Sequence, residues 1–160
     1  MSPTLIDAVI DTMHQRLLST AGVNGRVFED RAAAYTREDA PAIEIRAREA
    51  LATPLGDNHP VRSILQVQLR IDLCIYTRSA LDNAGSEASV RALAAPIWLS
   101  AHSLLMQDTT LGGLAARLRW QGVRWERENA DGTAGWTTHT YEAALAMREL
   151  NLQQPLGQSH

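Results

Sequence analysis

The sequence predicts a single α+β domain, in which two helices pack on one face of a mainly antiparallel sheet in the order α-β-β-β-α-β-β. Three observations predict this fold: two segments carry apolar residues at helical spacing, several others alternate apolar and polar residues, and an Asp-Gly turn separates the last two of these. The chain has 160 residues, of which 45% are hydrophobic, enough for one core. We expect the domain to occupy residues 1–150 and residues 151–160 to form a loose polar tail.

The first helix is expected to begin at Pro3-Thr4 and to end before Gly22, because glycine favours helix termination. Asp7 and Asp11 lie toward its N-terminal end, where the helix dipole favours acidic side chains. Its apolar residues recur on one face, at Ile6, Val9, Ile10, Met13, Leu17 and Leu18.

Strands are expected between the two helices. A short one at 26–28 is followed by a polar connector at 29–40, and residues 42–50 alternate as a strand with one solvent-facing side does. The clearest β pattern runs from 61 to 78, with apolar residues at every second position: Leu65, Val67, Leu69, Ile71, Leu73 and Ile75. Such a strand is about 14 residues, or roughly 45 Å, long and exceeds the usual length. We expect it to project beyond the sheet or to bend along it.

The second helix is expected to follow an N-cap at Ser86. Its apolar face is formed by Val90, Leu93, Ala94, Ile97, Ala101, Leu104 and Leu105. Pro96 lies inside this pattern and removes a backbone hydrogen bond, so we expect a kink there or a division into two helices. Asp108-Thr109-Thr110 ends the helix, and Gly112-Gly113 turns the chain into the next strand.

Two strands are expected to complete the sheet. In the first of them the apolar parity changes between Trp120 and Val123, which predicts a β-bulge at Gly122. Asp131-Gly132 predicts a hairpin turn. The last strand runs through Trp136, Thr138 and Thr140 toward Met147, although the alanine-rich segment 141–150 is also compatible with a helix.

Composition excludes several classes of protein. The net charge of -3 argues against a nucleic-acid-binding protein, which usually shows a basic excess. Cys74 is the single cysteine, so an intrachain disulfide is impossible and the chain suits a reducing compartment. Neither a signal peptide nor a transmembrane segment is expected. All 15 basic residues are arginine, which is explained by codon bias or by an assembly surface that prefers the planar guanidinium group.

The sequence offers no catalytic residues, no metal site and no cofactor site, and we expect the protein not to be an enzyme. Histidines lack metal-ligand spacing to cysteine or carboxylate partners, and we expect His14 and His102 at exposed or flanking positions. Cys74 has no signature of a neighbouring base, so it is expected to be a structural or half-buried thiol. The acidic residues are better explained by turns and by solvated strand positions: Asp108, Glu126, Glu128 and Asp131.

Arginine and tryptophan gather near the predicted bulge, and three interpretations remain open. They suit a single-stranded nucleic-acid surface, an ordinary amphipathic strand, or a protein interface, in which both residue types dominate the binding energy. The long strand and the hairpin are therefore our candidates for subunit or partner contacts, through Arg70, Arg117, Arg119, Trp120, Arg124, Trp125 and Trp136.

The sequence Asp108-Thr-Thr-Leu-Gly-Gly-Leu-Ala115 and the later Asp131-Gly-Thr-Ala-Gly135 resemble segments of the tail terminator proteins of long-tailed phages, the lambda-like minor tail protein family. Proteins of that family carry a helix that ends in a turn of this kind, then a strand, an Asp-Gly hairpin and a final Thr/Tyr-rich strand, as at 137–141 here. The upstream order of an N-terminal helix, a Pro-Ala-Ile strand at 41–45 and a long alternating strand also agrees, so the resemblance extends loosely over residues 4–150.

The resemblance implies a structural protein of the virion, found in the tail and neck and assembled in the host cytoplasm. It implies a homo-oligomeric ring, usually a hexamer, that caps the head-proximal end of the tail tube, stops its polymerisation and contacts a neck or head-completion protein. DNA would only pass through the lumen, which an acidic chain suits, and no membrane is involved. The alternatives are another tail-completion or head-tail connector protein and, in a different class, a cytosolic ligand-binding domain.

Overall fold

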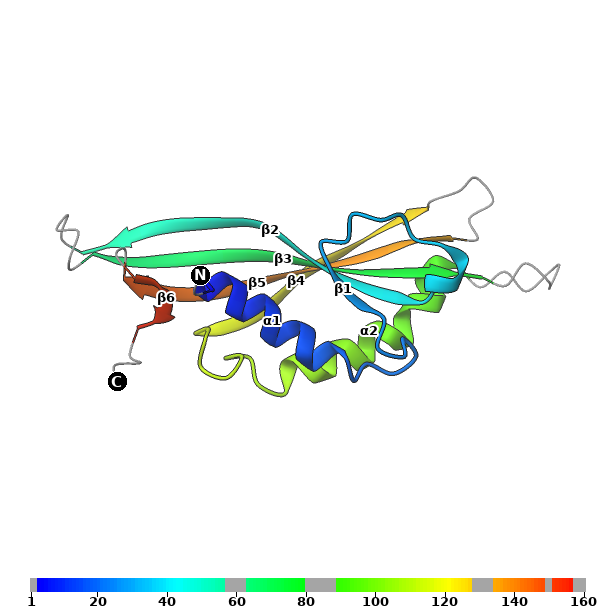
Figure 1. The fold of residues 1–160 in the computed structure, drawn as a ribbon, viewed down its shortest axis with the longest axis horizontal. Coiled ribbons are helices and arrows are strands. Elements are labelled where there is room, and N and C mark those ends of the chain that lie inside the picture. Colours follow the sequence, from blue (N-terminus) through cyan, green and yellow to red (C-terminus); the bar gives the residue numbers. More distant parts are fainter. Residues whose placement is uncertain (1–2, 57–62, 80–88, 128–133, 149–150, 157–160) are drawn as a thin grey trace.

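The computed structural model describes residues 3–56, 63–79, 89–127, 134–148 and 151–156. Two α-helices lie on one face of a six-stranded, mostly antiparallel sheet, which confirms the predicted α+β class. The molecule is elongated, and the strands on one side extend past the helices (Figure 1). Within the described residues, no helix is long and apolar enough to cross a membrane.

Helix α1 (Leu5–Leu17) begins where the sequence predicts. Thr4 is its N-cap: the Thr4 side chain accepts a hydrogen bond from the Asp7 backbone N–H, and the Asp7 carboxylate accepts one from the Thr4 backbone N–H. This reciprocal capping box satisfies backbone donors that the first turn leaves unpaired. The buried face of the helix consists of Leu5, Val9, Ile10, Met13 and Leu17.

Helix α2 (Val90–Met106) is one continuous helix that contains Pro96. Of the two predicted outcomes, a kink or a division into two helices, the division is therefore wrong. Its N-cap is Ser89, whose hydroxyl accepts a hydrogen bond from the Ala92 N–H at 3.1 Å. The predicted N-cap, Ser86, lies outside the described residues. The side chains buried from α2 are Val90, Ala94, Ile97, Ala101 and Leu105, whereas Leu93 and Leu104 are only half-buried.

The turn after α2 ties the two helices together. The Asp108 carboxylate accepts hydrogen bonds from the backbone N–H groups of Thr110 and Gly112, at 2.9 and 2.8 Å. Arg16 of α1 donates to the same carboxylate and to the Asp108 carbonyl. Leu111 is fully buried although its φ is 52°, in the left-handed region. The Asp108 motif therefore acts as a turn and a link to α1, as turn chemistry predicts.

The strands follow the order β1-β2-β3-β5-β4 across the sheet, and β6 also pairs with β5. In the described part of the chain, β1 and β2 pair in parallel and the other four pairs are antiparallel. The strand bounds are β1 Val27–Glu29, β2 Ala42–Leu55, β3 Ile64–Arg78, β4 Arg117–Arg127, β5 Ala134–Arg148 and β6 Asn151–Pro155, and a 3-10 turn, η1, spans Arg37–Asp39.

Three features of the last three strands differ from or complete the prediction. Residues 151–155 form β6 rather than part of a loose tail, because the chain reverses and pairs again with the end of β5. The segment that was compatible with strand or helix continues as β5 to Arg148. In β4, Trp120 is opposite Tyr141 and Gly122 is opposite Thr140, so the predicted bulge is present, with Gln121 as the extra residue.

The long strand β3 has two different halves. Up to Arg70 its polar residues are exposed and its apolar ones face the helices, but from Ile71 to Thr77 both faces are buried. The second cover comes from the connector after β1, where the Tyr35 ring lies 5.2 Å from Tyr76 and 4.8 Å from Trp136 between centroids. The sequence predicts a polar connector at 29–40. Its single aromatic residue, Tyr35, nevertheless packs on the sheet and covers this part of β3. Beyond this cover, β2 and β3 project past the N-terminus of α1 (Figure 1).

Candidate interaction surface

The predicted interface residues of β4 point to two different faces of the sheet. Residues directly opposite each other on paired strands share a face. Trp120 and Trp125 are opposite Tyr141 and Thr137, on the helix face, whereas Arg117, Arg119 and Arg124 are opposite the even-numbered residues of β5. Within β4, the predicted interface arginines and tryptophans therefore lie on opposite faces of the sheet.

The polar face of the sheet is organised around Asp72, whose side chain is only 2% exposed. Its carboxylate accepts hydrogen bonds from Arg48 of β2 at 2.6 Å, from Arg124 of β4 at 3.1 Å and from the Thr140 hydroxyl of β5 at 2.8 Å. Burial raises the pKa of Asp72, but these three donors outweigh it and hold the pKa below its ordinary value. Asp72 therefore links four neighbouring strands, and Arg124 is committed to it.

Two other predicted interface residues also have partners within the chain. Arg70 donates to Glu49 at 2.6 Å in an exposed ion pair, which leaves both side chains accessible. Trp136 is half-buried: its ring packs on Tyr76 at 4.9 Å, and the Arg46 guanidinium lies over it at 5.1 Å. Trp136 therefore belongs to the cover of the sheet, and its role as an interface residue stays a prediction.

On the helix face, an aromatic cluster lies between α2 and β4. Trp98 of α2 stacks on His139 with a centroid separation of 4.4 Å, and the Trp120 indole N–H donates to Nδ1 of His139 at 3.3 Å. Nδ1 of His102 lies 2.8 Å from the Tyr141 hydroxyl. Burial, together with the charge of His102, lowers the pKa of His139 to about 4, and burial lowers the pKa of His102. At neutral pH the low pKa leaves the His139 imidazole uncharged, so the cluster forms an aromatic floor in which this ring carries no charge.

Above this floor is a groove of about 210 Å³, lined by Arg91, Ala95, Trp98, Trp120, Val123, Trp125, Thr137 and His139. It is open because α2 covers β3 and β5 but leaves β4 partly uncovered. Trp120 is 40% exposed and Trp125 is 52% exposed. Exposed aromatic side chains beside an arginine are typical of protein interfaces.

A second groove, of about 190 Å³ and with an apolar surface, lies on the same face and extends from the β2 edge across β3 to β5 and β6. It is lined by Thr4, Ile6, Ala50, Ala52, Leu65, Val67, Met147 and Leu152. This groove opens where β2 and β3 extend past α1. On the other face of the same part of β2, Leu51 and Leu55 are 50% and 47% exposed. An apolar surface on an edge strand is a common site of association.

The remaining sequence candidates lie elsewhere. Cys74 is fully buried, not half-buried, and burial raises the pKa of its thiol. His14 of α1 is paired with Glu29 of β1, and Glu126 is exposed and accepts from Arg124. Glu128, Asp131 and Gly132 lie outside the described residues. Within the part of the chain that the structure describes, no group of three or more His, Cys, Asp or Glu residues is placed to hold a metal ion.

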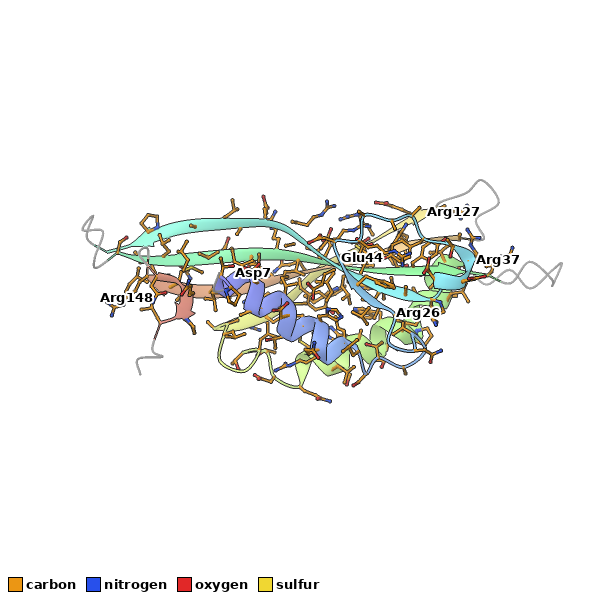
Figure 2. All side chains as sticks on the ribbon, viewed as in Figure 1. Asp7, Arg26, Arg37, Glu44, Arg127 and Arg148 are labelled. Atoms are coloured by element: carbon orange, nitrogen blue, oxygen red, sulfur yellow. The ribbon has the colours of Figure 1, made fainter. Side chains whose placement is uncertain are left out.

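Figure 2 shows that Arg127, the last residue of β4, and Arg148, the last residue of β5, lie toward opposite ends of the molecule. The partial exposure of Trp120 and Trp125 on β4 is hard to predict from the sequence. The alternation of apolar and polar residues predicts that one face of β4 is covered, but it does not show how far a helix extends over that face.

No known family model matches this chain, and the curated proteins contain no sequence that matches it.

Proposed function

We propose that this protein is a structural component of a phage virion: a tail terminator that forms a ring on the head-proximal end of the tail tube, stops tube polymerisation and joins the tube to the neck. The resemblance at residues 108–115 and 131–135 supports the class. The order of the elements agrees with it, since helix, long strand, second helix and Asp108 turn follow one another as they do in that family.

The observation that carries the ring is a sheet with two open edges. Among the described residues, β4 pairs with β5 alone, and β2 beyond Ile45 pairs with β3 alone. An edge strand presents unpaired N–H and C=O groups and is a template for another chain. The two edges differ, so a contact between them is head-to-tail, which is the kind of contact that closes into a ring.

The directions of the strands suit such a contact. Neighbours alternate in direction from β2 through β3 and β5 to β4, because each of these pairs is antiparallel. The edge strands β2 and β4 therefore run in opposite directions. When copies are related by rotation about an axis roughly along the strands, β4 of one copy meets β2 of the next in an antiparallel pair, which needs no inversion of either subunit.

The edges are also displaced along the strands. Gly122, the centre of β4, lies opposite Thr140, whereas Leu51 in the open part of β2 lies across β3 from Ala144. The displacement is four residues of β5, or roughly 13 Å. A sheet that closes on itself requires tilted strands and a stagger of this kind. A ring of copies would therefore use the stagger that one copy already contains.

The partners follow from this proposal. The ring has copies of the same chain as neighbours, the tail tube protein on one side and a neck or head-completion protein on the other. DNA is expected to pass through the lumen without binding, because a chain with a net charge of -3 does not attract phosphates.

Native mass spectrometry together with light scattering tests the proposal. We expect a closed oligomer with one defined number of copies, and we expect addition of that oligomer to stop the polymerisation of the cognate tail tube protein. A protein that is monomeric at every concentration, or that forms open-ended polymers, would contradict the proposal.

A further inference from the structure

We infer that Trp125 of one copy docks into the apolar groove beside β2 of the next copy, the groove that contains Ala50 and Ala52. This inference rests on the proposed ring but goes beyond it, because it names the side chain and the pocket that fix which copy follows which. The partner is therefore a second copy of this chain.

The size and chemistry of the groove suit an indole. Its lining is apolar, and its volume is about 190 Å³, whereas an apolar cavity of about 150 Å³ is large enough for a benzene ring. The small side chains of Ala50 and Ala52 leave the groove open on the side of the β2 edge. A large aromatic side chain beside small ones on the neighbouring strand fills space that two large side chains could not share.

Trp125 is the residue of β4 that is available for this contact. Trp120 is less exposed, its indole N–H donates to His139 and its ring lies 5.5 Å from that of Trp98. The Trp125 side chain is 52% exposed at the end of the strand beyond these contacts. Burying an exposed aromatic ring is among the largest single contributions to an interface.

The groove and Trp125 lie on the same face of the sheet. Trp125 is opposite Thr137, which in turn is opposite Ile75 of the helix-facing core, and Ala52 is opposite Val67 of the same core. Pairing β4 with β2 of the next copy keeps each face continuous. Trp125 is level with Thr137 of β5 and Ala50 is level with Ala143, so the contact requires β4 to pair with β2 of the next copy at an offset of six residues of β5, roughly 20 Å, two residues more than the offset between the centres of the two edges.

Charges next to the two surfaces are complementary. Arg91 and Arg127 line one cavity together with Trp125, and both are exposed. On the other side, Asp7 follows the groove residue Ile6, and Asp11 lies one turn further along α1; both are exposed.

The acidic side chains also lie toward the correct edge of the sheet. Asp7 precedes His14 by seven residues, which places both on one stripe of α1. His14 contacts Glu29 of β1, so this stripe faces the β1–β2 edge, whereas Arg16 faces the turn after α2. When Trp125 enters the groove, two arginines of one copy approach two aspartates of the next, which favours this partner over the reverse arrangement.

Cysteine cross-linking tests the inference directly, since the single native cysteine, Cys74, is fully buried and unreactive. The full chain carries Trp125→Cys together with either Ala50→Cys or Ala52→Cys, and it is oxidised at a concentration at which the oligomer forms. We expect one of these pairs to give a ladder of covalently linked subunits that reducing agent abolishes. The matched control is Trp125→Cys with Leu51→Cys: Leu51 lies between the two alanines in the chain but on the other face of the sheet.

The outcomes separate this inference from the proposed ring. An oligomer that forms but cross-links through neither alanine pair, or equally well through the Leu51 pair, overturns the docking of Trp125 and leaves the ring intact. A protein that stays monomeric contradicts the ring and the docking together.

A second variant guards against misfolding of the double mutants. Trp125→Ala, at an exposed position, is expected to leave the far-ultraviolet circular dichroism spectrum of the monomer unchanged and to weaken association by at least tenfold. The control Leu99→Ala removes a side chain that is 61% exposed on α2 and lines neither groove. Equal association of Trp125→Ala and the unmodified chain would overturn the inference.

Discussion

The two ends of the long sheet are built differently, although they share the same strands. At the covered end, from Ile71 to Thr77 of β3, both faces are buried, by the helices on one side and by the connector with Tyr35 on the other. The other end is a projecting arm, formed by residues 47–55 of β2 and 64–70 of β3. In this arm the residues of β2 are exposed, and the polar residues of β3, at every second position, are exposed as well. Within the described residues, the chain thus covers both faces of the sheet at one end only. In our proposal, the next copy of the chain covers the β2 edge of the projecting arm.

The core of the covered end should tolerate truncation of a side chain much less well than the arm does. Leu73 is fully buried at the covered end, so Leu73→Ala should reduce the free energy of unfolding by about 3 kcal/mol through lost burial and a cavity. Leu51→Ala, in the arm, should change the stability of the monomer by less than about 0.5 kcal/mol. Urea denaturation of the monomer measures both. Similar losses for the two variants would show that the arm is as well packed as the covered end.

The second prediction concerns Tyr35, the side chain that covers the sheet on the face away from the helices. Tyr35→Ala should reduce the free energy of unfolding by about 2 kcal/mol, because the rings of Tyr76 and Trp136 lose their packing partner. Tyr35→Phe keeps the ring and should restore most of the loss. The same denaturation experiment measures both variants, and an unchanged midpoint for Tyr35→Ala would mean that the connector does not stabilise this end.

The third prediction uses pH. The pKa of His139 is about 4 in the folded protein and near its ordinary value of 6.5 in the unfolded chain. The unfolded chain therefore binds the additional proton between these values, and stability should fall by about 2 kcal/mol as the pH is lowered from 7 to about 4.5. The low pKa of Asp72 keeps its ion pairs intact in this window.

Thermal unfolding as a function of pH measures this effect. His139→Phe keeps a ring against Trp98 but cannot be protonated, so its melting temperature should depend less on pH over the same window. A variant whose melting temperature falls as steeply as that of the unmodified chain would show that His139 is not the group responsible.

The smallest expected effect is in the arm. The Arg70–Glu49 pair is exposed, with both side chains more than 40% accessible, so Arg70→Ala should cost less than about 1 kcal/mol, and added salt should remove the difference. Chemical denaturation at low and high ionic strength measures it. A larger loss that resists salt would indicate that Arg70 is buried in an assembly under those conditions.

Much of the fold is predictable from local patterns. The alternation in β3, the capping residue Thr4 and the change of parity around Gln121 each depend on residues close together in the chain, and each is present in the structure. Pro96 was harder to predict, because whether a proline divides a helix depends on the packing around it. The strand β6 was missed for a similar reason: its sequence is polar, and it is a strand because it pairs with β5.

The interaction surface was only partly predictable. The sequence drew attention to Trp120 and Trp125, and strand alternation with the bulge already separates them from Arg124. It could not show that both tryptophans stay partly exposed, since that depends on how much of β4 the helices cover. The Asp72 network joins four strands that are far apart in the chain, and its single local signal was a carboxylate in a strongly alternating strand. Open edges are likewise a property of the assembled sheet.

Hydrogen–deuterium exchange of the assembled and monomeric fractions, separated by size, tests the central claim most directly. We predict that the outward-facing amides of residues 47–55 and 117–127 exchange fast in the monomer and become protected together in the oligomer, because each edge becomes a paired strand. An oligomer in which both segments exchange as fast as in the monomer would contradict it.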